Sequence, residues 1–367
     1  MTRGVVVVGG GFAALEIALS LRKGRRDIPV SVVSTETEAT YRPWLIKLPA
    51  SGAQPPVIPF ARLLAEAGVE LVTGVASSVD LDARRLVLAS GSAVEYRQLV
   101  VATGASADRD RVPGARQHAL FPCERADAVD FAVRVASGVA SVAVVFGWER
   151  PGPGLEYAAW IARHRPGVRV TAIDADGTLE RLFGEAATAR IRIIFERRGG
   201  QLLSDGPVMR IAERTVELSS RAIVADLVAL ASPLCGNTAW LPRAALDERG
   251  MLRIDSAMAA SNGVFGIGDV VAAPEDRRLP PTLQSIRSTA GRAAANLARA
   301  FDGSALKPVL MPGRPDLVGP DLAGDAVFVR DRRLVMSGRL PLLIRSIMDR
   351  RYLSLRKAHP ARDSGGA

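Results

Sequence analysis

The chain has 367 residues, a formal net charge of +10 and only two cysteines, Cys123 and Cys235. This length favours roughly two domains of ~150 residues each. Two cysteines exclude a disulfide framework and favour a reducing, cytoplasmic setting. The three histidines lack metal-ligand spacing, and no apolar run approaches the about 18 residues of a spanning helix, so we expect neither a metal site nor a membrane span. The first residues also lack the pattern of a secretory signal peptide.

A glycine-rich turn stands near the start of the chain, between a strand and a helix. Four valines at residues 5–8 read as a strand buried on both faces of a parallel sheet. The spacing Gly9-x-Gly11-x-x-Ala14 is the dinucleotide fingerprint, which permits Ala in the third place. A turn without a ligand is the alternative. The helix N-terminus would offer its free N–H groups to phosphates, so the candidate ligand-binding residues are Gly9, Gly11, Phe12, Ala13 and Ala14.

The next strand, residues 28–33, is where such a half carries its ribose ligand. In the fingerprint an acidic residue at the end of this strand binds the adenosine ribose. Ser34 stands at that position here, and Glu36 and Glu38 follow closely enough to substitute. We therefore expect Ser34 and Glu36 to lie beside the cofactor.

A short connection from Tyr41 to Pro49 gathers aromatic, cationic and proline residues. Such a composition suits a loop that packs against a planar ring, and an ordinary surface loop is the alternative. The residues of interest in this connection are Arg42, Pro43, Trp44 and Lys47.

Strands are expected at residues 69–73, 76–80 and 85–89, followed by a hairpin turn at Ser90-Gly91-Ser92. A buried strand then enters Ala102-Thr103-Gly104, where glycine frees the backbone to turn sharply. This segment resembles the strand that closes the first half of a two-dinucleotide flavoprotein. The resemblance implies that Ala102, Thr103 and Gly104 contact the cofactor.

A second glycine turn follows an expected helix at residues 125–136. The apolar strand 142–146 enters glycines, and a new helix opens at Gly154-Leu155-Glu156. The strand after it, 168–173, ends in Asp174, where the ribose ligand of a nicotinamide half belongs. The candidate nicotinamide-nucleotide contacts are therefore Gly154, Glu156 and Asp174.

This second turn departs from the fingerprint. Trp148, Glu149 and Arg150 occupy places where the backbone should approach phosphate, and prolines 151 and 153 remove N–H donors. Either the loop has an insertion, or this half no longer binds a dinucleotide in the usual way.

A third signal, Val264 to Asp269, combines a strand, glycines and a carboxylate at the carboxyl end of the strand. Asp269 could accept a hydrogen bond from a flavin hydroxyl. An alanine-rich helix is expected from Ser285 to Phe301, and its N-terminus would direct a positive dipole at the flavin. The candidate contacts here are Gly268, Asp269 and Gln284.

The stretch from Leu340 to Lys357 approximates a basic amphipathic helix, with Leu343, Ile347 and either Leu353 or Tyr352 on one face. Composition alone would allow nucleic acid, anionic lipid or an anionic cofactor as the partner of the positive charge. The helix either lies on an anionic membrane or caps its domain with a solvated face. No nucleic-acid partner is expected.

In their order along the chain, these motifs resemble the pyridine-nucleotide-disulfide-oxidoreductase-like flavoproteins, and among them the type II NADH:quinone and sulfide:quinone oxidoreductases. The resemblance implies an α/β fold with two Rossmann-like FAD/NAD(P)-binding domains and a short C-terminal segment. It implies FAD in the first domain and NAD(P)H in the second. The implied domains are 1–109 and 246–305 for FAD, 110–245 for NAD(P), and 306–367 as an interface or membrane-surface segment.

The resemblance also assigns roles to single residues. Pro43 and Trp44 would shape the flavin pocket, and Lys47 would place a charge beside the reacting atoms of the flavin, so Lys47 and Trp44 are the candidate catalytic residues. Of the family's quinone signature, Ala-Gln-x-Ala-x-Gln, only Gln284 matches. Asp174 favours NADH over NADPH, and the family's redox disulfide is absent.

The expected function is that of an FAD-dependent oxidoreductase passing electrons from NAD(P)H to a quinone or another small acceptor. One alternative, motivated by the disrupted second turn, oxidises a small biosynthetic substrate with FAD and uses no nicotinamide. A second alternative, motivated by the basic tail, is a non-catalytic FAD-binding protein at a membrane. The sequence leaves these alternatives, and the oligomeric state, open.

Overall fold

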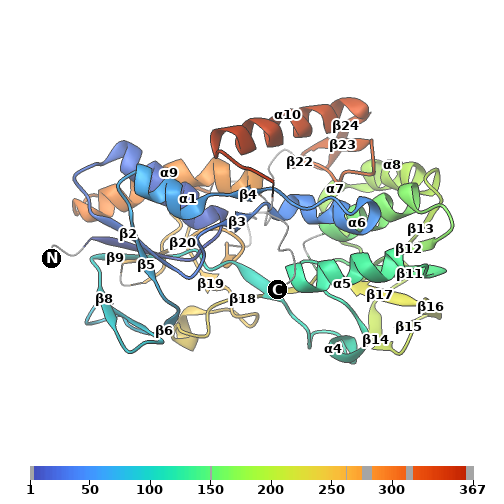
Figure 1. The fold of residues 1–367 in the computed structure, drawn as a ribbon, viewed down its shortest axis with the longest axis horizontal. Helices are drawn as coiled ribbons and strands as arrows, with labels where there is room; N and C mark the ends of the chain where they lie inside the picture. Colours follow the sequence, from blue (N-terminus) through green and yellow to red (C-terminus); the bar gives the residue numbers. More distant parts are fainter. Residues whose placement is uncertain (1–3, 149–150, 262, 275–282, 311–316, 361–367) are drawn as a thin grey trace. The chain divides into compact units, whose positions relative to one another are not determined.

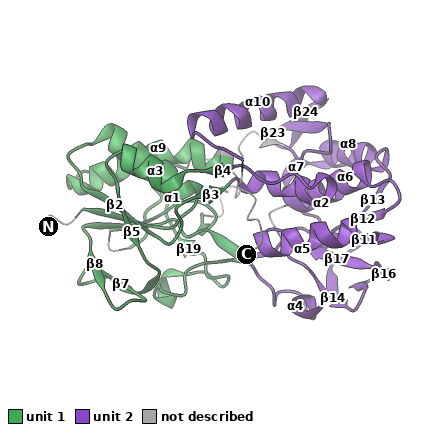
Figure 2. Cartoon of the chain, viewed as in Figure 1, with its two compact units in different colours: residues 1–40, 57–106, 235–313 green, residues 41–56, 107–234, 314–367 purple. Residues whose placement is uncertain are grey.

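The computed structural model describes residues 4–148, 151–261, 263–274, 283–310 and 317–360. Its contacts divide the chain into two compact units, coloured green and purple in Figure 2. Unit 1 comprises residues 1–40, 57–106 and 235–313, and unit 2 comprises residues 41–56, 107–234 and 314–367. Each unit is therefore assembled from three separate stretches of the chain.

A five-stranded parallel sheet forms the core of unit 1, in the order β20-β9-β1-β2-β5 (Figure 1). At its centre, β1 (Val5–Val8) has all four valines buried, as its unbroken apolar run predicts. Because every pairing is parallel, the carboxyl ends of the strands meet along one edge of the sheet. The other strands are β2 (Val30–Ser34), β5 (Glu70–Thr73), β9 (Gln98–Val101) and β20 (Val264–Gly266).

Two long helices of unit 1, α1 (Phe12–Gly24) and α9 (Leu283–Phe301), pack against each other. Both begin close to the positions that the sequence predicts, and the alanines of α9 at 290, 293 and 294 are buried. The smaller elements are β3 (Ala39–Thr40), β4 (Val57–Ile58), α3 (Phe60–Glu66), β6 (Ala76–Asp80), β7 (Arg85–Leu88), β8 (Ala93–Glu95), β10 (Ala105–Ala107), β18 (Leu234–Gly236), η2 (Arg243–Ala245), β19 (Leu252–Arg253) and β21 (Val271–Ala272).

A second parallel sheet, in the order β13-β12-β11-β17, forms the core of unit 2. Its central strand β11 (Ser141–Phe146) is buried along its whole length and packs on both faces, because Val142 and Val144 join one apolar cluster while Ala143 and Val145 join another. The elements around it are β12 (Arg169–Asp174), β13 (Gly200–Leu203), β17 (Leu227–Leu230), α4 (Ala115–His118), α5 (Arg125–Ala136), α6 (Pro151–His164), α7 (Thr178–Phe183), α8 (Glu185–Glu196), β14 (Val208–Ala212), β15 (Thr215–Leu218) and β16 (Ala222–Val224).

The connection expected as a loop is instead helical and belongs to unit 2. Residues 42–47 form the 3₁₀-helix η1 (Arg42–Lys47), which runs directly into α2 (Leu48–Ser51). The proline in the first turn of η1 suits a helix start, and Leu45 and Ile46 are buried in the unit 2 core. Burial of apolar side chains therefore makes this segment helical. Its aromatic, basic and proline residues had indicated a loop.

The C-terminal residues also join unit 2. They form β22 (Leu317–Val318), the hairpin of β23 (Ala326–Arg330) and β24 (Arg333–Gly338), and the helix α10 (Arg339–Leu355). The sequence had predicted the helix but not the hairpin. Compared with the expected boundaries at 109 and 245, the contacts divide the chain after residues 106 and 234 and leave no separate C-terminal segment.

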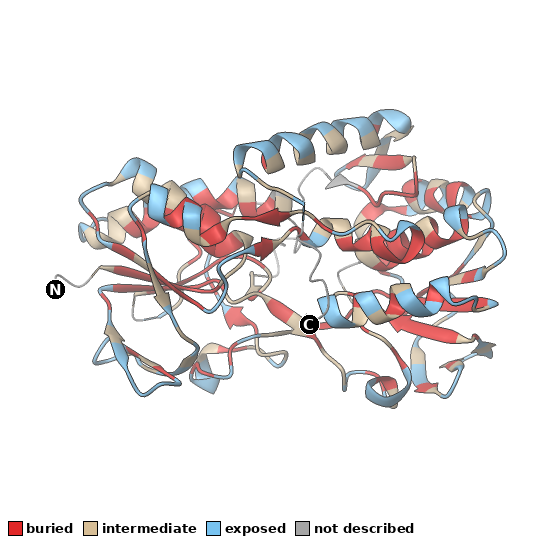
Figure 3. Ribbon diagram, in the orientation of Figure 1, coloured by how far each residue is buried: buried red, intermediate tan, exposed pale blue. Residues whose placement is uncertain are grey.

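The helix α10 is exposed along much of its length, as Figure 3 shows. Tyr352, one of the two candidates for the apolar face of this helix, is buried with its ring centroid 6.2 Å from that of Tyr41, whereas Leu343 and Ile347 are exposed. Among the described residues, no helix combines the length and apolar character needed to cross a membrane. The exposed apolar residues of α10 are Leu340, Leu343, Ile344, Ile347 and Leu355.

Candidate functional site

The first glycine turn lies at the carboxyl end of β1 in unit 1. Gly9 has a φ of +142°, and a β carbon there would stand 2.3 Å from the Ala102 carbonyl oxygen. Only glycine fits such a position. Backbone hydrogen bonds hold the turn, since Gly9 N–H donates to Val33 O at 3.0 Å and Ala102 N–H donates to Val8 O at 2.9 Å.

The other two glycines of this turn have different surroundings. A β carbon at Gly10 would lie 2.4 Å from Ser34 Oγ and 2.7 Å from Glu36 Cγ, whereas one at Gly11 would meet nothing within 4 Å. Ser34 and Glu36, the predicted ribose contacts, therefore stand against the turn. The open space at Gly11 lies at the N-terminus of α1, where N–H groups can bind phosphate.

The two other sequence motifs of unit 1 meet the same turn. A β carbon at Gly268 would stand 2.8 Å from the β carbon of Ala13, so the third motif reaches the first turn of α1. Ala102 lies against Gly9, and the next residue, Thr103, has a buried hydroxyl without a hydrogen-bond partner among the described residues. A buried hydroxyl normally has a partner. The open space beside Gly11 and this hydroxyl together fit FAD.

Two of the candidate contacts in unit 1 need separate mention. Asp269 is half-buried directly after Gly268. Gln284 falls on α9, but its side chain lies outside the described part of the chain.

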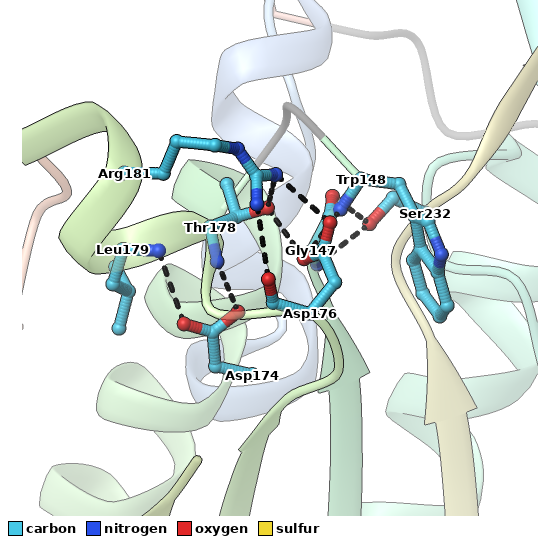
Figure 4. A network of polar contacts seen from close by, with 8 residues as sticks. All are labelled: Gly147, Trp148, Asp174, Asp176, Thr178, Leu179, Arg181 and Ser232. Carbon is cyan, nitrogen blue, oxygen red and sulfur yellow. Dashed lines mark hydrogen bonds and ion pairs between the residues drawn. The ribbon is translucent and has the colours of Figure 1, made fainter. Parts of the chain in front are cut away.

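The second turn, in unit 2, begins like the first. Gly147 follows β11 and has the same φ of +142° as Gly9. Here side chains hold the turn (Figure 4): Gly147 N–H donates to Ser232 Oγ at 3.1 Å, and the Ser232 hydroxyl donates to Gly147 O at 3.0 Å. Trp148 N–H donates to Asp176 Oδ1 at 3.1 Å. Ser232 was missed because it lies in the loop after β17, which neighbours β11 in the sheet but is distant from it in sequence.

Asp174 ends β12 as predicted, but its carboxylate is engaged within the protein. Both oxygens accept backbone N–H groups at the start of α7, from Thr178 and from Leu179, each at 3.0 Å. The residue is 2% exposed, and burial raises its pKa above the ordinary value. Asp174 therefore caps α7, a role that the sequence analysis did not consider.

Asp176, two residues further, faces the glycine turn. It accepts hydrogen bonds from Trp148 N–H, from the Thr178 hydroxyl and from Arg181 Nη2, the last at 2.8 Å. Although burial opposes the shift, the hydrogen bonds from Thr178 and Arg181 hold the pKa of Asp176 below its ordinary value. Asp176, Thr178 and Arg181 were missed because the sequence Asp174-Ala175-Asp176 offers two acids and the first one ends the strand.

Gly154 and Glu156 sit on α6 just beyond this turn. A β carbon at Gly154 would lie 2.4 Å from Phe146 Cβ, so glycine permits close helix–strand packing. Glu156 is buried and pairs with Arg345 of α10, and it also accepts the Asp321 N–H at 2.9 Å. Burial raises the pKa of Glu156. The protein thus occupies Glu156 with its own C-terminal residues.

The two candidate catalytic residues lie together in unit 2. Lys47 Nζ is 3.9 Å from the ring centroid of Trp44 and 5.1 Å from that of Trp160, an arrangement of cation–π contacts. Burial lowers the pKa of Lys47, and nearby Asp321 opposes that shift. Arg42 is exposed and Pro43 half-buried on the same 3₁₀-helix.

The described residues form neither a disulfide bond nor a cluster suited to a metal ion. In the described part of the chain, Cys123 and Cys235 are not joined by a disulfide bond. Within the described ranges, no group of three His, Cys, Asp or Glu side chains is placed to hold a metal ion.

Comparison with known proteins adds a family. Residues 3–294 match the family model described as pyridine nucleotide-disulphide oxidoreductase. The chain is 28% identical over 345 residues to the nitric oxide reductase FlRd-NAD(+) reductase of Aeromonas hydrophila, a match covering 88% of this chain and 84% of that protein. It is 29% identical over 301 residues to the peroxisomal monodehydroascorbate reductase 4 of Arabidopsis thaliana, covering 73% of this chain and 60% of that protein. The chain thus spans less than two thirds of the plant relative.

Solved structures show the same fold. The sulfide:quinone oxidoreductase from Aquifex aeolicus has a TM-score of 0.81 at 19% identity, over 97% of this chain and 91% of that one. The ferredoxin reductase for the CYP199A2 system from Rhodopseudomonas palustris has a TM-score of 0.69 at 23% identity, over 88% of this chain and 81% of that one. Similarity at these identities concerns the fold, and the predicted two-half α/β architecture is confirmed.

Proposed function

We propose that this chain delivers electrons to a quinone or another small acceptor. The chain belongs to the pyridine nucleotide-disulphide oxidoreductase family, and it is an FAD-dependent oxidoreductase that uses NAD(P)H. Hydride transfer from nicotinamide to flavin is the chemistry that the two cofactors supply when bound. The sequence holds only two cysteines, Cys123 and Cys235, and lacks the family's closely spaced redox pair. We therefore propose that electrons leave the flavin directly to a small acceptor.

The observation that carries the proposal is the meeting of three motifs at one edge of the unit 1 sheet. Gly9, Ala102 and Gly268 lie at the carboxyl ends of β1, β9 and β20, and the unpartnered hydroxyl of Thr103 lies beside them. In open parallel sheets, ligands bind outside the carboxyl ends of the strands. These residues would hold and orient FAD, while Gly154 and the turn at Gly147 would hold the nicotinamide nucleotide.

Trp44 and Lys47 remain the proposed catalytic residues. A lysine whose pKa is lowered by burial exchanges a proton closer to neutral pH than an exposed lysine does. The two indole rings beside Lys47 Nζ restrict where that ammonium group can lie. Lys47 is thus suited to move a proton as the acceptor is reduced.

An anaerobic titration tests this function. Purified holoenzyme is mixed with NADH or NADPH while the visible flavin absorbance is followed, and a water-soluble short-chain quinone is then added. We expect the absorbance to bleach with the nicotinamide and to recover with the quinone. If neither NADH nor NADPH bleaches the flavin, the result favours the alternative of an oxidase that uses no nicotinamide. If oxygen reoxidises the reduced flavin but the quinone does not, quinone is excluded as the acceptor.

We also infer that α10 docks on an anionic membrane surface, which would place the enzyme beside lipid-soluble quinone. Its exposed apolar residues recur at the spacing of one helix face, with Leu340 and Leu343 57% and 55% exposed and Ile347 56% exposed. Arg339, Arg350 and Arg351 are exposed on the same helix. An apolar stripe bordered by arginines complements anionic lipid headgroups and the acyl boundary beneath them.

Vesicle flotation tests this docking. We expect the wild-type protein to float with vesicles containing anionic lipid and to remain below with neutral vesicles. The double variant L343S/I347S should lose flotation while keeping its flavin and melting temperature, because both side chains are exposed. Equal flotation of variant and wild type would remove the membrane proposal, and a wild-type dimer that the same variant converts to monomer would assign the stripe to a second copy instead.

A further inference from the structure

We infer that Asp176, and not the strand-end Asp174, binds the adenosine-ribose hydroxyls of the nicotinamide coenzyme, and that Arg181 is the residue that positions it. This inference rests on the proposed use of NAD(P)H and adds the residue that selects NADH over NADPH. It assigns a binding role to a turn that follows the strand instead of to the strand end itself.

The first step is that Asp174 is buried at the start of α7. Each of its two carboxylate oxygens accepts an N–H group of α7, from Thr178 and Leu179, and the residue is 2% exposed. A ribose hydroxyl could reach this carboxylate only if the start of α7 moved aside, which would separate these N–H groups from their acceptor. An unpaired buried N–H group costs about 1–3 kcal/mol, so the cap on α7 is the stable use of Asp174.

The second step is the position of Asp176. Its Oδ1 lies 3.1 Å from Trp148 N and would be 2.6 Å from a β carbon at Gly147, so the carboxylate stands directly against the first residue of the glycine turn (Figure 4). In a doubly wound nucleotide half, the adenosine ribose lies between this turn and the acid that follows the second strand. Asp176 is also more accessible, with its side chain 28% exposed.

The third step concerns charge. Arg181 donates to both the carboxylate and the backbone carbonyl of Asp176, and its Nη2 also donates to the Thr178 hydroxyl. These contacts fix the guanidinium against the protein and keep the Asp176 carboxylate facing the turn. A fixed carboxylate accepts hydrogen bonds from ribose hydroxyls and repels the phosphate that NADPH carries at the same position.

The test measures binding of coenzyme fragments and needs no electron transfer. FAD-loaded protein is titrated calorimetrically with ADP-ribose and with 2′-phospho-ADP-ribose. The wild type should bind ADP-ribose more tightly. Asp176→Asn should weaken ADP-ribose by about 10- to 100-fold, the effect of a lost hydrogen bond to a charged group, and should reduce or reverse the preference between the two fragments.

Asp174→Asn is the matched control, since it makes the same chemical change two residues away. It should lower the melting temperature through the weakened α7 cap and leave the preference between the fragments unchanged. Arg181→Ala should also shift the preference, and Arg181→Lys should restore part of it, which a purely structural role would not produce.

The inference is overturned if the wild type does not bind ADP-ribose, if folded Asp176→Asn keeps the wild-type preference, or if Asp174→Asn is the variant that changes it. The proposed function fails separately. If ADP-ribose binds with the expected preference but NADH does not bleach the flavin, the residue assignment stands and the electron-transfer proposal does not.

Discussion

Gly9 and Gly147 each follow the central strand of a parallel sheet and share a φ of +142°, yet the chain closes the two turns by different means. At Gly9 the backbone does so, through N–H groups of Gly9 and Ala102. At Gly147 the side chains of Ser232 and Asp176 accept the N–H groups of the turn, and the backbone adds a bond from Ala175 N–H to Phe146 O. Backbone groups therefore close the turn in unit 1, whereas the turn in unit 2 also engages side chains, among them the Asp176 that we propose as the ribose ligand.

The helices after the two turns differ in the same way. Ala14-Leu15-Glu16 on α1 and Gly154-Leu155-Glu156 on α6 share a small residue, a leucine and a buried glutamate. The small residue comes five positions after Gly9 but seven after Gly147, so the second turn carries an insertion of two residues. The inserted residues and the additional side-chain hydrogen bonds thus occur in the same turn, and substitutions should affect the two turns unequally.

The largest effect is expected at the buried pair of Glu156 and Arg345. Arg345→Met leaves the Glu156 carboxylate buried without its guanidinium, and removing one partner of a buried pair costs about 3–5 kcal/mol. Urea unfolding should show this loss of stability. The charge-neutral double variant E156Q/R345M should recover most of it, and a single variant as stable as the wild type would contradict the buried pair.

The next effect compares the glycines directly. Backbone strain at this φ costs about 1–3 kcal/mol in either alanine variant. Gly9→Ala adds an overlap with a backbone carbonyl, that of Ala102, in the turn proposed to hold FAD, whereas Gly147→Ala overlaps a side-chain oxygen of Asp176 in the other unit. We expect Gly9→Ala to be purified without flavin and Gly147→Ala to retain it, as absorbance spectra will report. Flavin retained equally by both variants would break the comparison.

A smaller effect is expected from Ser232. Ser232→Ala removes both hydrogen bonds to Gly147 and leaves a buried N–H unpaired, at a cost of about 1–3 kcal/mol. In unit 1, Thr103→Val should leave the stability of flavin-free protein unchanged or slightly raised, because its hydroxyl has no partner among the described residues. Thermal unfolding of both variants, with and without FAD, checks the contrast; Thr103→Val should lower only the stabilisation that FAD provides.

The smallest effect is a pH dependence at Lys47. Because burial lowers its pKa below 10.5, the unfolded chain binds this proton more tightly than the folded chain does. The stability of the wild type relative to Lys47→Met should therefore rise as the pH rises toward 10.5 and stay constant below the folded pKa. Melting temperatures across that range measure it, and parallel curves for the two proteins would show that Lys47 titrates as an exposed lysine.

Sequence patterns located most of the parallel strands and long helices. The helix at 125–136 and the strand at 5–8 have the predicted bounds, because each is long or uniform enough in its apolar pattern to leave one interpretation. The positions of Gly9, Ala102 and Gly268 at one sheet edge followed from motif order. These are the features in which local pattern and tertiary packing agree.

The missed features depend on contacts that the sequence does not record. The hairpin of β23 and β24 turns at Asp331 and Arg332, both with positive φ, where glycine or asparagine would have signalled the turn. Asp174 and Asp176 are chemically identical, and only the N–H groups of α7 decide which one is occupied. Arg345 is half-buried against Glu156 although Leu343 and Ile344 are exposed, so the helix pattern alone could not orient it.

The interleaving of chain stretches has a consequence for biosynthesis. Leu322, Ala323 and Val327 belong to the same apolar cluster as Leu45 and Ile46, so the unit 2 core contains residues that lie far apart in the sequence. A ribosome that has released residues up to 234 has supplied only part of that core. Unit 2 can reach its final packing only after residues 322–329 have left the ribosome, and a fragment ending before residue 314 would expose apolar surface to aggregation.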